Sequence, residues 1–590
     1  MSRRACYPRP DFRRETWMSL NGAWRFSFGD EEKDRMDQPP TLSQMPLTIE
    51  VPYVYQCELS GIGQTESHDA VWYGKTFRLP DCFDERTHLI FGAVDWHCDL
   101  FVNGRYAGSH DGGYTPFRTD ITPFLRADGE QELILRVEDT LRCDQLRGKQ
   151  SWEKEPSRCW YTPSTGIWQS VWLERVPDNP IQSIHITPNL PQSEIRCEIS
   201  LNKPPKKDGQ FKIDVQYQGH SIAALTYKTK QMNVDLSVPI QPEDYIDEIH
   251  YWTPDHPNLY DVTVSYASDG QTDQVFTYFG FRDVCTRDGK TLLNHRPIYQ
   301  RLILHQGYYD GGLLTADTDE RYRTDLQTIK DMGFNGVRMH QKIEDPLFYY
   351  WADKIGLLVW GELPSCYEFS ELAMRRSFES MREFIQRDYN HPSIVCWVPL
   401  NESWGVRNIE HNAAQQRYAV SLYHFIKAMD STRWVSTNDG WEQVTTDFCT
   451  LHDYSFDGKA LSSRWDDLDA LLQSAAQDRM IFASGYQYTG QPILLTEFGG
   501  VAFKTNQSKK DWGYCAIEKN EASYIRRLTS LFSYIKTNRR IQGYCYTQFT
   551  DVMQETNGLL SIRREPKIAI DAIRSILFET DDSAPLSPVP

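Results

Sequence analysis

The sequence predicts a multidomain protein in which two β-sandwiches precede a (β/α)8 barrel. The chain has 590 residues, which is more than one hydrophobic core usually serves. Its first part carries short segments of alternating hydrophobicity separated by turn residues, as sandwiches do. After about Asp283, short apolar strands alternate with helical stretches, which is typical of a parallel α/β fold. We therefore expect domains at residues 1–176, 177–284 and 285–590.

The first sandwich is clearest at residues 94–102, where apolar and polar side chains alternate up to Asn103-Gly104. Alternation with a period of two that runs into Asn-Gly predicts a β-hairpin. Further strands are expected at residues 23–28, 72–78, 132–137 and 169–174. Residues 177–180, Pro-Asp-Asn-Pro, then form a natural linker.

The second, smaller sandwich is indicated by renewed alternation after this linker. Its strands are expected at residues 195–201, 211–217 and 262–266. The segment carries no cluster of histidines, cysteines or converging carboxylates, so we expect it to be a scaffold.

The third domain contains eight candidate strands. They lie at residues 299–305, 334–340, 357–362, 394–402, 434–438, 448–452, 493–497 and 542–548. The helix before the second strand has Leu326 and Ile329 at helical spacing and ends at Gly333, and Asp345-Pro346 is a helix start with an N-cap and a first-turn proline. Eight strands over about 300 residues predict a (β/α)8 barrel.

Composition excludes several classes of protein. A formal charge of -18 argues against a nucleic acid partner, which clustered lysines and arginines would hold. No segment approaches the ~20 apolar residues of a membrane span. The 13 cysteines are dispersed without paired spacing and are expected to be reduced thiols, so we expect a cytoplasmic protein. Seventeen tryptophans and 32 tyrosines supply aromatic faces of the kind that suit sugars, although most should belong to cores.

Two apolar strands of the predicted barrel end on glutamate. Residues 394–402 read Ile-Val-Cys-Trp-Val-Pro-Leu-Asn-Glu, and residues 492–500 read Pro-Ile-Leu-Leu-Thr-Glu-Phe-Gly-Gly. The carboxyl ends of barrel strands form the pocket, so Glu402 and Glu497 should meet there. Retaining glycosidases use two carboxyl groups about 5 to 5.5 Å apart, one as nucleophile and one as acid/base. Glu362 ends a third strand, and strand position alone does not decide which two of the three react.

The two chemical roles require different pKa values. The acid must stay protonated through burial and the field of the other carboxylate, whereas the nucleophile needs donors that keep it ionised. Arg338 could hold the nucleophile ionised or form a structural ion pair. Asn401 could donate to a sugar hydroxyl or cap the turn, and Tyr454 could donate to a carboxylate or simply pack.

Three histidines fall at strand ends, His305, His340 and His452, and are candidates to bind sugar hydroxyls. For an isolated histidine, a hydrogen-bonded residue of the pocket wall without a catalytic part is the favoured interpretation. They carry no metal-ligand motif, so neither a metal nor a cofactor is expected.

The chain resembles glycoside hydrolase family two. The motifs that carry the resemblance are Asn390-His-Pro-Ser-Ile394 leading to Asn401-Glu402-Ser-Trp404-Gly, Thr496-Glu497-Phe-Gly-Gly, Leu20-Asn-Gly-Ala-Trp24-Arg-Phe, Gly166-Ile-Trp-Gln-Ser-Val-Trp172-Leu, Trp252-Thr-Pro-Asp-His-Pro-Asn-Leu259-Tyr and Phe279-Gly-Phe-Arg282. The resemblance implies a jelly-roll sugar-binding domain, an immunoglobulin-like β-sandwich and a catalytic TIM barrel. It also implies that Glu402 is the acid/base and Glu497 the nucleophile, and it sets Glu362 aside.

Departures from the family pattern bear on the sugar. Asn557 and the residues after it lack the Asn-x-Lys motif with which glucuronidases of the family pair the substrate carboxylate, so a uronic acid is disfavoured. Residues 304–308, Leu-His-Gln-Gly-Tyr, stand where β-galactosidases have Arg-His-Glu, and Trp160 stands where they place an aspartate. Tyr546 and Gln548 replace part of a tryptophan-rich eighth strand and could floor or flank the pocket.

The predicted activity is that of a retaining exo-glycosidase, with a β-galactosidase-type sugar first. The alternatives are a β-galactofuranosidase or α-L-arabinofuranosidase, then a β-mannosidase or β-glucuronidase. A carbohydrate-binding protein with an inactive barrel is the alternative outside enzymes. Family members often assemble, so a homo-oligomer is a further expectation. Beside Glu402 and Glu497, the candidate substrate-binding residues are Asn401, Arg338, His305, His340, Glu362, His452, Tyr454, Tyr546, Gln548 and Trp160.

Overall fold

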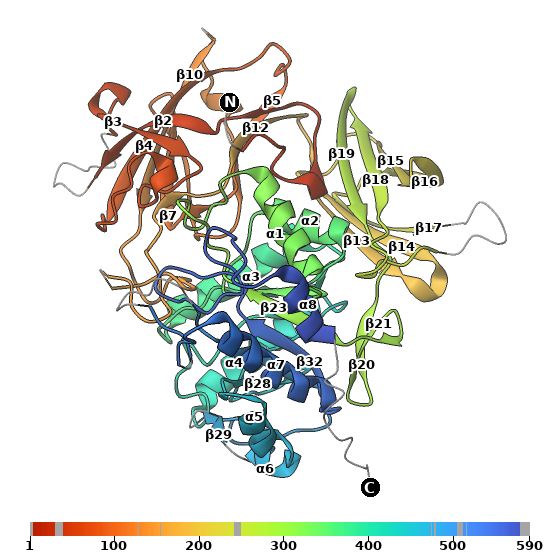
Figure 1. Ribbon diagram of the computed structural model, residues 1–590. Coiled ribbons are helices and arrows are strands. Elements are labelled where there is room, and N and C mark those ends of the chain that lie inside the picture. The colour runs from red at the N-terminus through yellow and green to blue at the C-terminus, as the bar shows by residue number, and fades with distance from the viewer. Residues whose placement is uncertain are drawn as a thin grey trace.

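The computed structural model of the protein describes residues 4–578, apart from residues 30–38, 128, 154, 241–248, 474, 477, 478, 504–510 and 515. Within this part of the chain the two sandwiches lie at the top of Figure 1, in red to orange and in yellow to green. The barrel lies below them, in green to blue. The fold class predicted from the sequence is confirmed.

The first sandwich pairs a four-stranded sheet, in the order β1-β12-β5-β9, with a six-stranded sheet, in the order β3-β2-β4-β10-β7-β8. Their bounds are β1 (Trp17–Ser19), β2 (Gly22–Phe28), β3 (Leu47–Val51), β4 (Ala70–Arg78), β5 (Arg86–Phe91), β7 (His97–Val102), β8 (Arg105–Asp111), β9 (Phe117–Asp120), β10 (Glu130–Glu138) and β12 (Val171–Val176). Apolar side chains of both sheets, among them Phe26, Leu89, Leu100 and Leu133, are buried between them.

The hairpin predicted at Asn103-Gly104 joins β7 and β8. Both turn residues have positive φ, 52° and 76°, as a two-residue turn of type I′ requires. The alternating run before the turn is not one strand, because β6 (Val94–Asp95) pairs with β11 (Gly166–Ile167) in a separate small sheet. The buried Asp95 accepts a hydrogen bond from Gln150 Nε2 at 2.6 Å and so belongs to a loop network.

The second sandwich pairs a three-stranded sheet, in the order β13-β14-β17, with a four-stranded sheet, in the order β16-β15-β18-β19. The bounds are β13 (Ile181–Asn189), β14 (Glu194–Leu201), β15 (Gly209–Tyr217), β16 (His220–Thr229), β17 (Asn233–Pro239), β18 (Tyr260–Ser268) and β19 (Gln271–Phe279). In β14 and β15 every second residue is buried, as the period-two pattern predicts.

The barrel strands form one parallel sheet in the order β27-β26-β25-β24-β23-β32-β31-β28. Their bounds are β23 (Gln300–His305), β24 (Gly336–Met339), β25 (Leu358–Glu362), β26 (Ile394–Val398), β27 (Trp434–Val435), β28 (Cys449–Asp453), β31 (Ile493–Gly499) and β32 (Ile541–Thr547). The fourth strand is shorter than predicted, because Pro399 has no N–H to continue the ladder. Glu402 therefore lies in the bend that follows β26, at φ 51°.

Helices cover the barrel. Their bounds are α1 (Asp319–Asp331), α2 (Pro346–Ile355), α3 (Glu371–Asp388), α4 (Ala413–Met429), α5 (Gly458–Trp465), α6 (Leu468–Gln473), α7 (Glu521–Thr537) and α8 (Ile570–Phe578). The predicted start of α2 is confirmed, since the Asp345 side chain accepts from the N–H of Leu347. The predicted end of α1 is also confirmed, with Gly333 at φ 101° just beyond it.

Smaller elements complete the described chain. They are β20 (Val284–Arg287), β21 (Lys290–Leu293), β22 (Arg296–Pro297), β29 (Ala475–Ala476), β30 (Arg479–Met480), and the 3-10 helices η1 (Pro10–Phe12), η2 (Leu42–Gln44), η3 (Glu58–Ser60), η4 (Thr122–Phe124) and η5 (Leu190–Gln192).

The amino-terminal segment ties the three domains together. Arg4 is buried and pairs with Asp319 and Asp345 of the barrel at 2.5 and 2.6 Å. Arg14 pairs with Glu174 of the first sandwich and Asp273 of the second, both at 2.8 Å. Because partnerless buried charges are costly, these pairs favour one relative placement of the domains.

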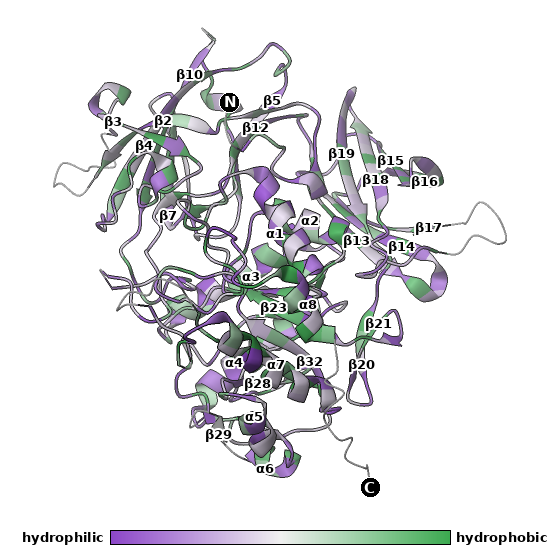
Figure 2. Ribbon diagram, viewed as in Figure 1, coloured by the Kyte–Doolittle hydropathy of each residue, from purple (hydrophilic) through white to green (hydrophobic). Residues whose placement is uncertain are grey.

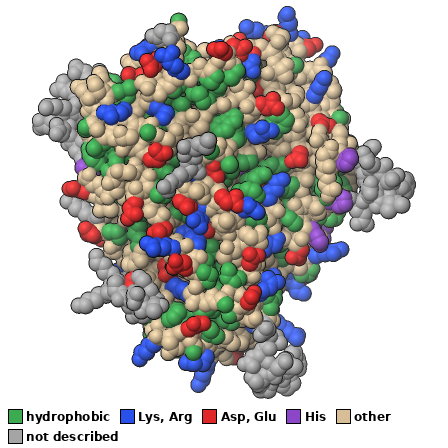
Figure 3. Space-filling view, turned by 45° about the horizontal axis from the view of Figure 1, so that its top comes forward, with side chains coloured by type: hydrophobic (Ala, Val, Ile, Leu, Met, Phe, Trp, Pro, Cys, Tyr) green, Lys and Arg blue, Asp and Glu red, His purple; other side chains and the backbone are tan. Residues whose placement is uncertain are grey.

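Hydropathy follows this architecture. In Figure 2 the central barrel strand β23 is largely hydrophobic, whereas the outer loops are mostly hydrophilic. On the face drawn in Figure 3, acidic and basic side chains are interspersed rather than gathered by sign. Among the described helices, none is both long and apolar enough to cross a membrane.

Candidate active site

Arg338, at the carboxyl end of β24, lies at the centre of a buried cluster of charged side chains. Its Nε is 3.0 Å from Glu362 Oε2, and its Nη1 is 2.7 Å from Asp439 Oδ2 and 3.0 Å from Glu497 Oε1. Its Nη2 donates to Asn401 Oδ1 at 2.7 Å. The guanidinium is fully buried, so one cation holds acidic and amide side chains from four strand ends in fixed positions.

Glu497 lies within β31 and is 4% exposed. Its two oxygens accept from different donors, Arg338 Nη1 at 3.0 Å and the Tyr454 hydroxyl at 2.6 Å. The ring of Tyr454 is in turn stacked on Tyr514, with ring centroids 3.7 Å apart. Donors on both oxygens favour the ionised carboxylate.

His452, at the end of β28, links the two predicted catalytic glutamates. Its Nδ1 is 2.8 Å from Glu402 Oε1 and 3.5 Å from Glu497 Oε2, and its Nε2 is 3.0 Å from Asp439 Oδ2. The other oxygen of Glu402 accepts from Trp404 Nε1 at 3.3 Å. One oxygen of each glutamate and one nitrogen of the imidazole all lie within 4.8 Å of one another. The sequence predicts a pocket-wall residue at His452, whereas its contacts in the structure are with the carboxylates themselves.

The electrostatics of this trio differ from the sequence expectation. Burial alone would lower the pKa of His452, but the charge of Glu497 and hydrogen bonds to Asp439 and Glu402 raise it to about 10. Burial alone would raise the pKa of Glu402, but the hydrogen bond and charge of His452 lower it to about 2. The Glu402–His452 pair therefore holds one proton, and this proton rests on the imidazole.

Glu362 and His340 form the buried base of the cluster. His340 Nδ1 is 3.1 Å from Glu362 Oε2, which Arg338 also contacts. Burial raises the pKa of Glu362 to about 7, assisted by the charge of Asp439 and opposed by Arg338. Burial and the charge of Arg338 hold the pKa of His340 well below its ordinary value. Glu362 is therefore a buried partner of Arg338, with no exposed surface.

The barrel mouth is lined by aromatic side chains from two domains. Trp160, from the first sandwich, donates from Nε1 to the Tyr367 hydroxyl at 2.7 Å. Its ring is 5.0 Å from that of Trp404, nearly perpendicular to it. Because Trp404 donates to Glu402, Trp160 lies one side chain away from the acidic pair.

Two predicted pocket residues lie elsewhere. His305 accepts at Nδ1 from the N–H of Gly307 at 2.9 Å, and its Nε2 faces Asp325 of α1 at 3.7 Å. The ring of Tyr546 is fully buried against Phe532 of α7. Tyr546 is therefore on the outer face of the barrel wall, because neighbouring residues of a strand point to opposite faces.

Gln548 joins a network between the eighth strand and the first sandwich. Its Nε2 donates to Asn557 Oδ1 at 2.6 Å, and Asn557 Nδ2 donates to Glu555 Oε1 at 3.0 Å. Glu555 Oε2 accepts from the Tyr161 hydroxyl at 2.6 Å. The buried Gln548 thus holds the loop after β32 in place.

Sequence reasoning missed two charged residues of the site. Asp439 closely follows β27, and its position after the fifth strand was a usable signal. Lys149 comes from the first sandwich and is 7% exposed. Its charge acts on Glu402 and Glu497, but no pattern in the sequence linked it to the barrel.

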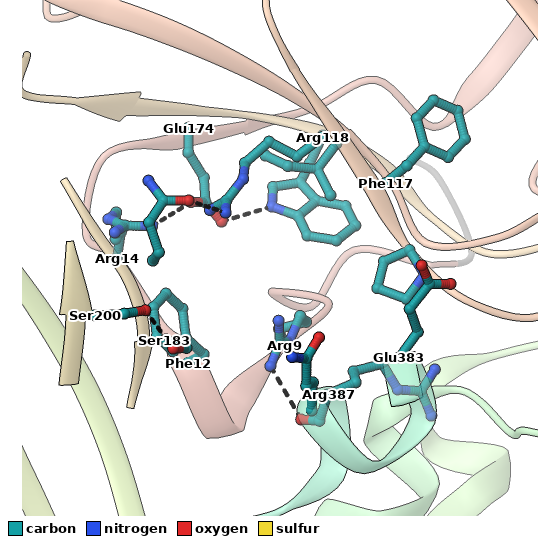
Figure 4. Close-up of a pocket in the computed structure, with 15 residues that line it drawn as sticks. Arg9, Phe12, Arg14, Phe117, Arg118, Glu174, Ser183, Ser200, Glu383 and Arg387 are labelled. Atoms are coloured by element: carbon teal, nitrogen blue, oxygen red, sulfur yellow. Dashed lines mark hydrogen bonds and ion pairs between the residues drawn. The ribbon is translucent and has the colours of Figure 1, made fainter. Parts of the chain in front are cut away.

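A separate cavity of about 500 Å³ lies where the three domains meet (Figure 4). Its wall includes Arg14 and Arg118 from the first sandwich, Ser183 from the second, and Glu383 and Arg387 from α3. None of its lining residues belongs to the carboxylate cluster. Arg14 already pairs there with Glu174 and Asp273, so we interpret the cavity as a space at the junction of the domains.

Family comparisons match nearly the whole chain. Residues 17–177 match "Glycosyl hydrolases family 2, sugar binding domain", residues 179–282 match "Glycosyl hydrolases family 2", and residues 284–576 match "Glycosyl hydrolases family 2, TIM barrel domain". The protein belongs to glycoside hydrolase family 2. The resemblance predicted from the sequence motifs is confirmed.

Relatives in the family have different names. The chain is 26% identical over 416 residues to a putative beta-glucuronidase of Formosa agariphila, covering 69% of this chain and 48% of the relative. It is 29% identical over 396 residues to a beta-galactosidase of Thermoanaerobacter pseudethanolicus, covering 65% of this chain and 50% of the relative. The chain thus spans about half the length of these two curated relatives. A solved beta-D-glucuronidase from Dictyoglomus thermophilum has the same fold, with TM-score 0.77, 19% identity and 98% and 99% of the two chains covered.

Proposed function

We propose that the protein is a retaining exo-glycosidase that releases a terminal sugar by double displacement. Membership of glycoside hydrolase family 2 supports hydrolysis of O-glycosyl bonds. The observation that carries the mechanism is the approach of Glu402 and Glu497 oxygens to within 4.8 Å. Retaining enzymes need carboxyl groups about 5 to 5.5 Å apart, whereas inverting enzymes need about 6.5 to 9.5 Å for a water.

Glu497 is the proposed nucleophile. Arg338 and Tyr454 each donate to one of its oxygens, which keeps the carboxylate ionised and oriented toward the anomeric carbon. Glu402 is the proposed acid/base. Its side chain retains 20% exposure, so the oxygen of a departing group can reach it, whereas Glu362 is completely enclosed.

His452 supplies the proton in this scheme. In the free protein the proton rests on its ring, and Glu402 passes it to the glycosidic oxygen as Glu497 forms the glycosyl ester. That bond consumes the Glu497 charge, which is the foremost influence raising the pKa of His452. Glu402 is then a carboxylate beside a less basic imidazole, ready to take a proton from the water that cleaves the ester. The proton returns to His452 at the end of the cycle.

The walls around the pair support action on a terminal sugar. Trp160 and Tyr161 of the first sandwich contact Tyr367 and Glu555 of the barrel at 2.7 and 2.6 Å. One side of the barrel mouth is therefore closed by another domain, as suits an end-on pocket better than an open cleft.

A sugar of galactose configuration remains the first proposal, since the relatives of the chain include several named beta-galactosidases. Furanosides, mannosides and glucuronides are the alternatives. A panel of nitrophenyl glycosides, with each pyranose supplied both as the neutral sugar and as its uronic acid, ranks the ring configurations. We expect turnover to be highest on a galactose-configured pair, and preferred turnover of a furanoside or mannoside would contradict this.

Replacement of Glu497 by glycine tests the mechanism. We expect loss of hydrolysis and partial rescue by azide, with an inverted glycosyl azide as product identified by NMR. An unchanged rate in Glu497→Gly would remove it as nucleophile. The alternative of a carbohydrate-binding protein with an inactive barrel predicts sugar binding without turnover in the wild type, and the intact carboxylate pair argues against it.

A further inference from the structure

A loop of the first sandwich forms part of the barrel mouth. We call residues 147–161 the mouth loop; they lie between β10 and β11. The N–H groups of Arg147 and Gly148 donate to Ser365 O at 3.0 and 3.1 Å, and the Tyr367 hydroxyl donates to Gly148 O. The loop is thereby fixed to the residues that follow β25, at the end of the barrel where Glu402 and Glu497 lie.

The mouth loop carries Lys149 into the site. Its carbonyl accepts from the N–H of Tyr161 at 2.8 Å, and the Tyr161 hydroxyl reaches Glu555 of the barrel. The Lys149 side chain is 7% exposed. Its charge acts on Glu555, Glu402 and Glu497 and helps to lower the pKa of His340, so the ammonium is close enough to interact electrostatically with the carboxylate cluster.

Lys149 differs from the structural lysine nearby. Lys342 is also buried, and its Nζ donates to Gly307 O at 2.6 Å, to Leu314 O at 2.7 Å and to Glu344 at 2.5 Å. Among the described residues, no carboxylate lies within the 4.0 Å ion-pair distance of Lys149 Nζ. Its nearest acidic neighbour is Cys159, but burial raises the pKa of that thiol, so it stays neutral at pH 7. Lys149 is thus a buried ammonium without a direct counter-ion.

A second cation, Arg407, lies near Glu402. The Arg407 guanidinium is stacked 3.7 Å above the ring of Trp404, the residue that donates to Glu402. Burial and the charge of Arg479 lower its pKa. No ion pair of Arg407 is found in the described part of the chain. The charges of Lys149 and Arg407 therefore both act on the proposed acid/base, and within the described residues neither cation forms an ion pair with a carboxylate.

We propose that Lys149 binds the carboxylate of an acidic sugar, so that the enzyme acts on uronides. A neutral sugar would cover the ammonium and remove its water without supplying a counter-ion, which is costly. The carboxylate of a uronate would supply this counter-ion and accept a charge-assisted hydrogen bond from the Lys149 ammonium. The inference rests on the proposed function, because it assumes that the sugar binds beside Glu402 and Glu497.

This assignment also accounts for the missing Asn-x-Lys motif. The Asn-x-Lys motif is absent at Asn557, whose side chain is hydrogen-bonded to Gln548 and Glu555. The structure brings a lysine to the site from a different domain. The missing Asn-x-Lys motif therefore does not by itself argue against a uronic acid, because Lys149 can supply the cation.

Matched substrates test the inference. Nitrophenyl β-galactoside and β-galacturonide, and the corresponding glucoside and glucuronide, differ within each pair only at C6. We expect the wild type to favour the uronide of the better pair. We expect Lys149→Met to lower kcat/KM for the uronide by about 100-fold, the loss typical of breaking a buried charge pair, and for its neutral partner by less than about tenfold. Lys354→Met, on an exposed site of α2, is the control and should leave both values unchanged.

Two outcomes of the kinetic comparison would overturn the inference. One is a wild type that prefers the neutral member of each pair, a result that needs no variant to fold. The other is a Lys149→Met protein that melts like the wild type yet loses both activities equally. Titration of the wild type with free galacturonate and galactose provides a check without turnover, and tighter binding of galactose would also overturn it. Failure of the proposed glycosidase function would give a different result from failure of the Lys149 inference. In that case no substrate of any pair would be hydrolysed, or Glu497→Gly would hydrolyse its substrate at the wild-type rate.

Discussion

Replacing His452 by glutamine removes the cation that lies between three carboxylates. The imidazole contacts Glu402, Asp439 and Glu497 at 2.8 to 3.5 Å, and despite burial these groups raise its pKa from 6.5 to about 10. Each pKa unit corresponds to about 1.4 kcal/mol, so the protonated ring contributes on the order of 5 kcal/mol to the free energy of unfolding. Because the pKa is raised in the folded state, this contribution is complete below pH 6.5 and is lost as the pH rises toward 10.

Melting temperatures of the wild type and His452→Gln, measured at constant ionic strength between about pH 6 and pH 10, test this. We expect the variant to melt about 8 °C lower near pH 6, the shift that about 5 kcal/mol produces in a domain of roughly 300 residues. The gap should narrow steadily with pH, as the wild-type ring loses its proton. A gap that stays constant over this range would mean that His452 is neutral in the folded protein, and the proposed route of the proton through it would fail.

Two further variants probe the acid/base and the mouth loop. In Glu402→Ala we expect a larger loss of rate on alkyl glycosides than on nitrophenyl glycosides, because good leaving groups need little protonation; equal losses on both would count against the acid role. In Gly148→Ala the added Cβ would collide with Gln341 O, at a residue whose φ of 57° already disfavours a side chain. We expect about 1 to 3 kcal/mol of destabilisation, measured as a lower melting temperature, together with a reduced kcat/KM. Gly219→Ala, at φ 83° with no atom within 4 Å, is the control for backbone strain alone, and a loss of kcat/KM as large there would refute a special role for the loop contact.

The fold could be predicted because its signals are local. Alternation in residues 195–201 and 211–217 and the Asn103-Gly104 turn specify strands and a hairpin without reference to distant contacts. The same local logic explains the error at the fourth barrel strand, where apolar residues continue past Val398 although Pro399 cannot extend the ladder.

The candidate site was only partly predictable. Strand-end position identified Glu402, Glu497, Arg338 and Tyr454, which the structure brings together. It could not separate inward from outward side chains, because both faces of a barrel strand are buried and hydropathy does not alternate. Tyr546 therefore entered the list of pocket residues although its neighbour Thr547 is the one that accepts from the Tyr454 hydroxyl.

Contacts between domains could not be predicted from the sequence. Lys149 and Trp160 reach the barrel because the mouth loop is fixed to Ser365 and Tyr367. These partners are far away in the sequence: Trp160 and Tyr367, for example, are 207 positions apart. Such long-range pairings depend on how whole domains pack, and no periodicity or local motif encodes them.

The buried pairs of Arg4 set an order of events during synthesis. Arg4 emerges from the ribosome 315 residues before Asp319, its partner in α1. At about 5 to 20 residues per second, it waits about 15 to 60 s for that partner to be made. The first sandwich can therefore fold early, whereas the pairs of Arg4 with Asp319 and Asp345 form only after the start of the barrel has been made. Translation speed between Arg4 and Asp319 thus sets the earliest time at which these pairs between domains can form.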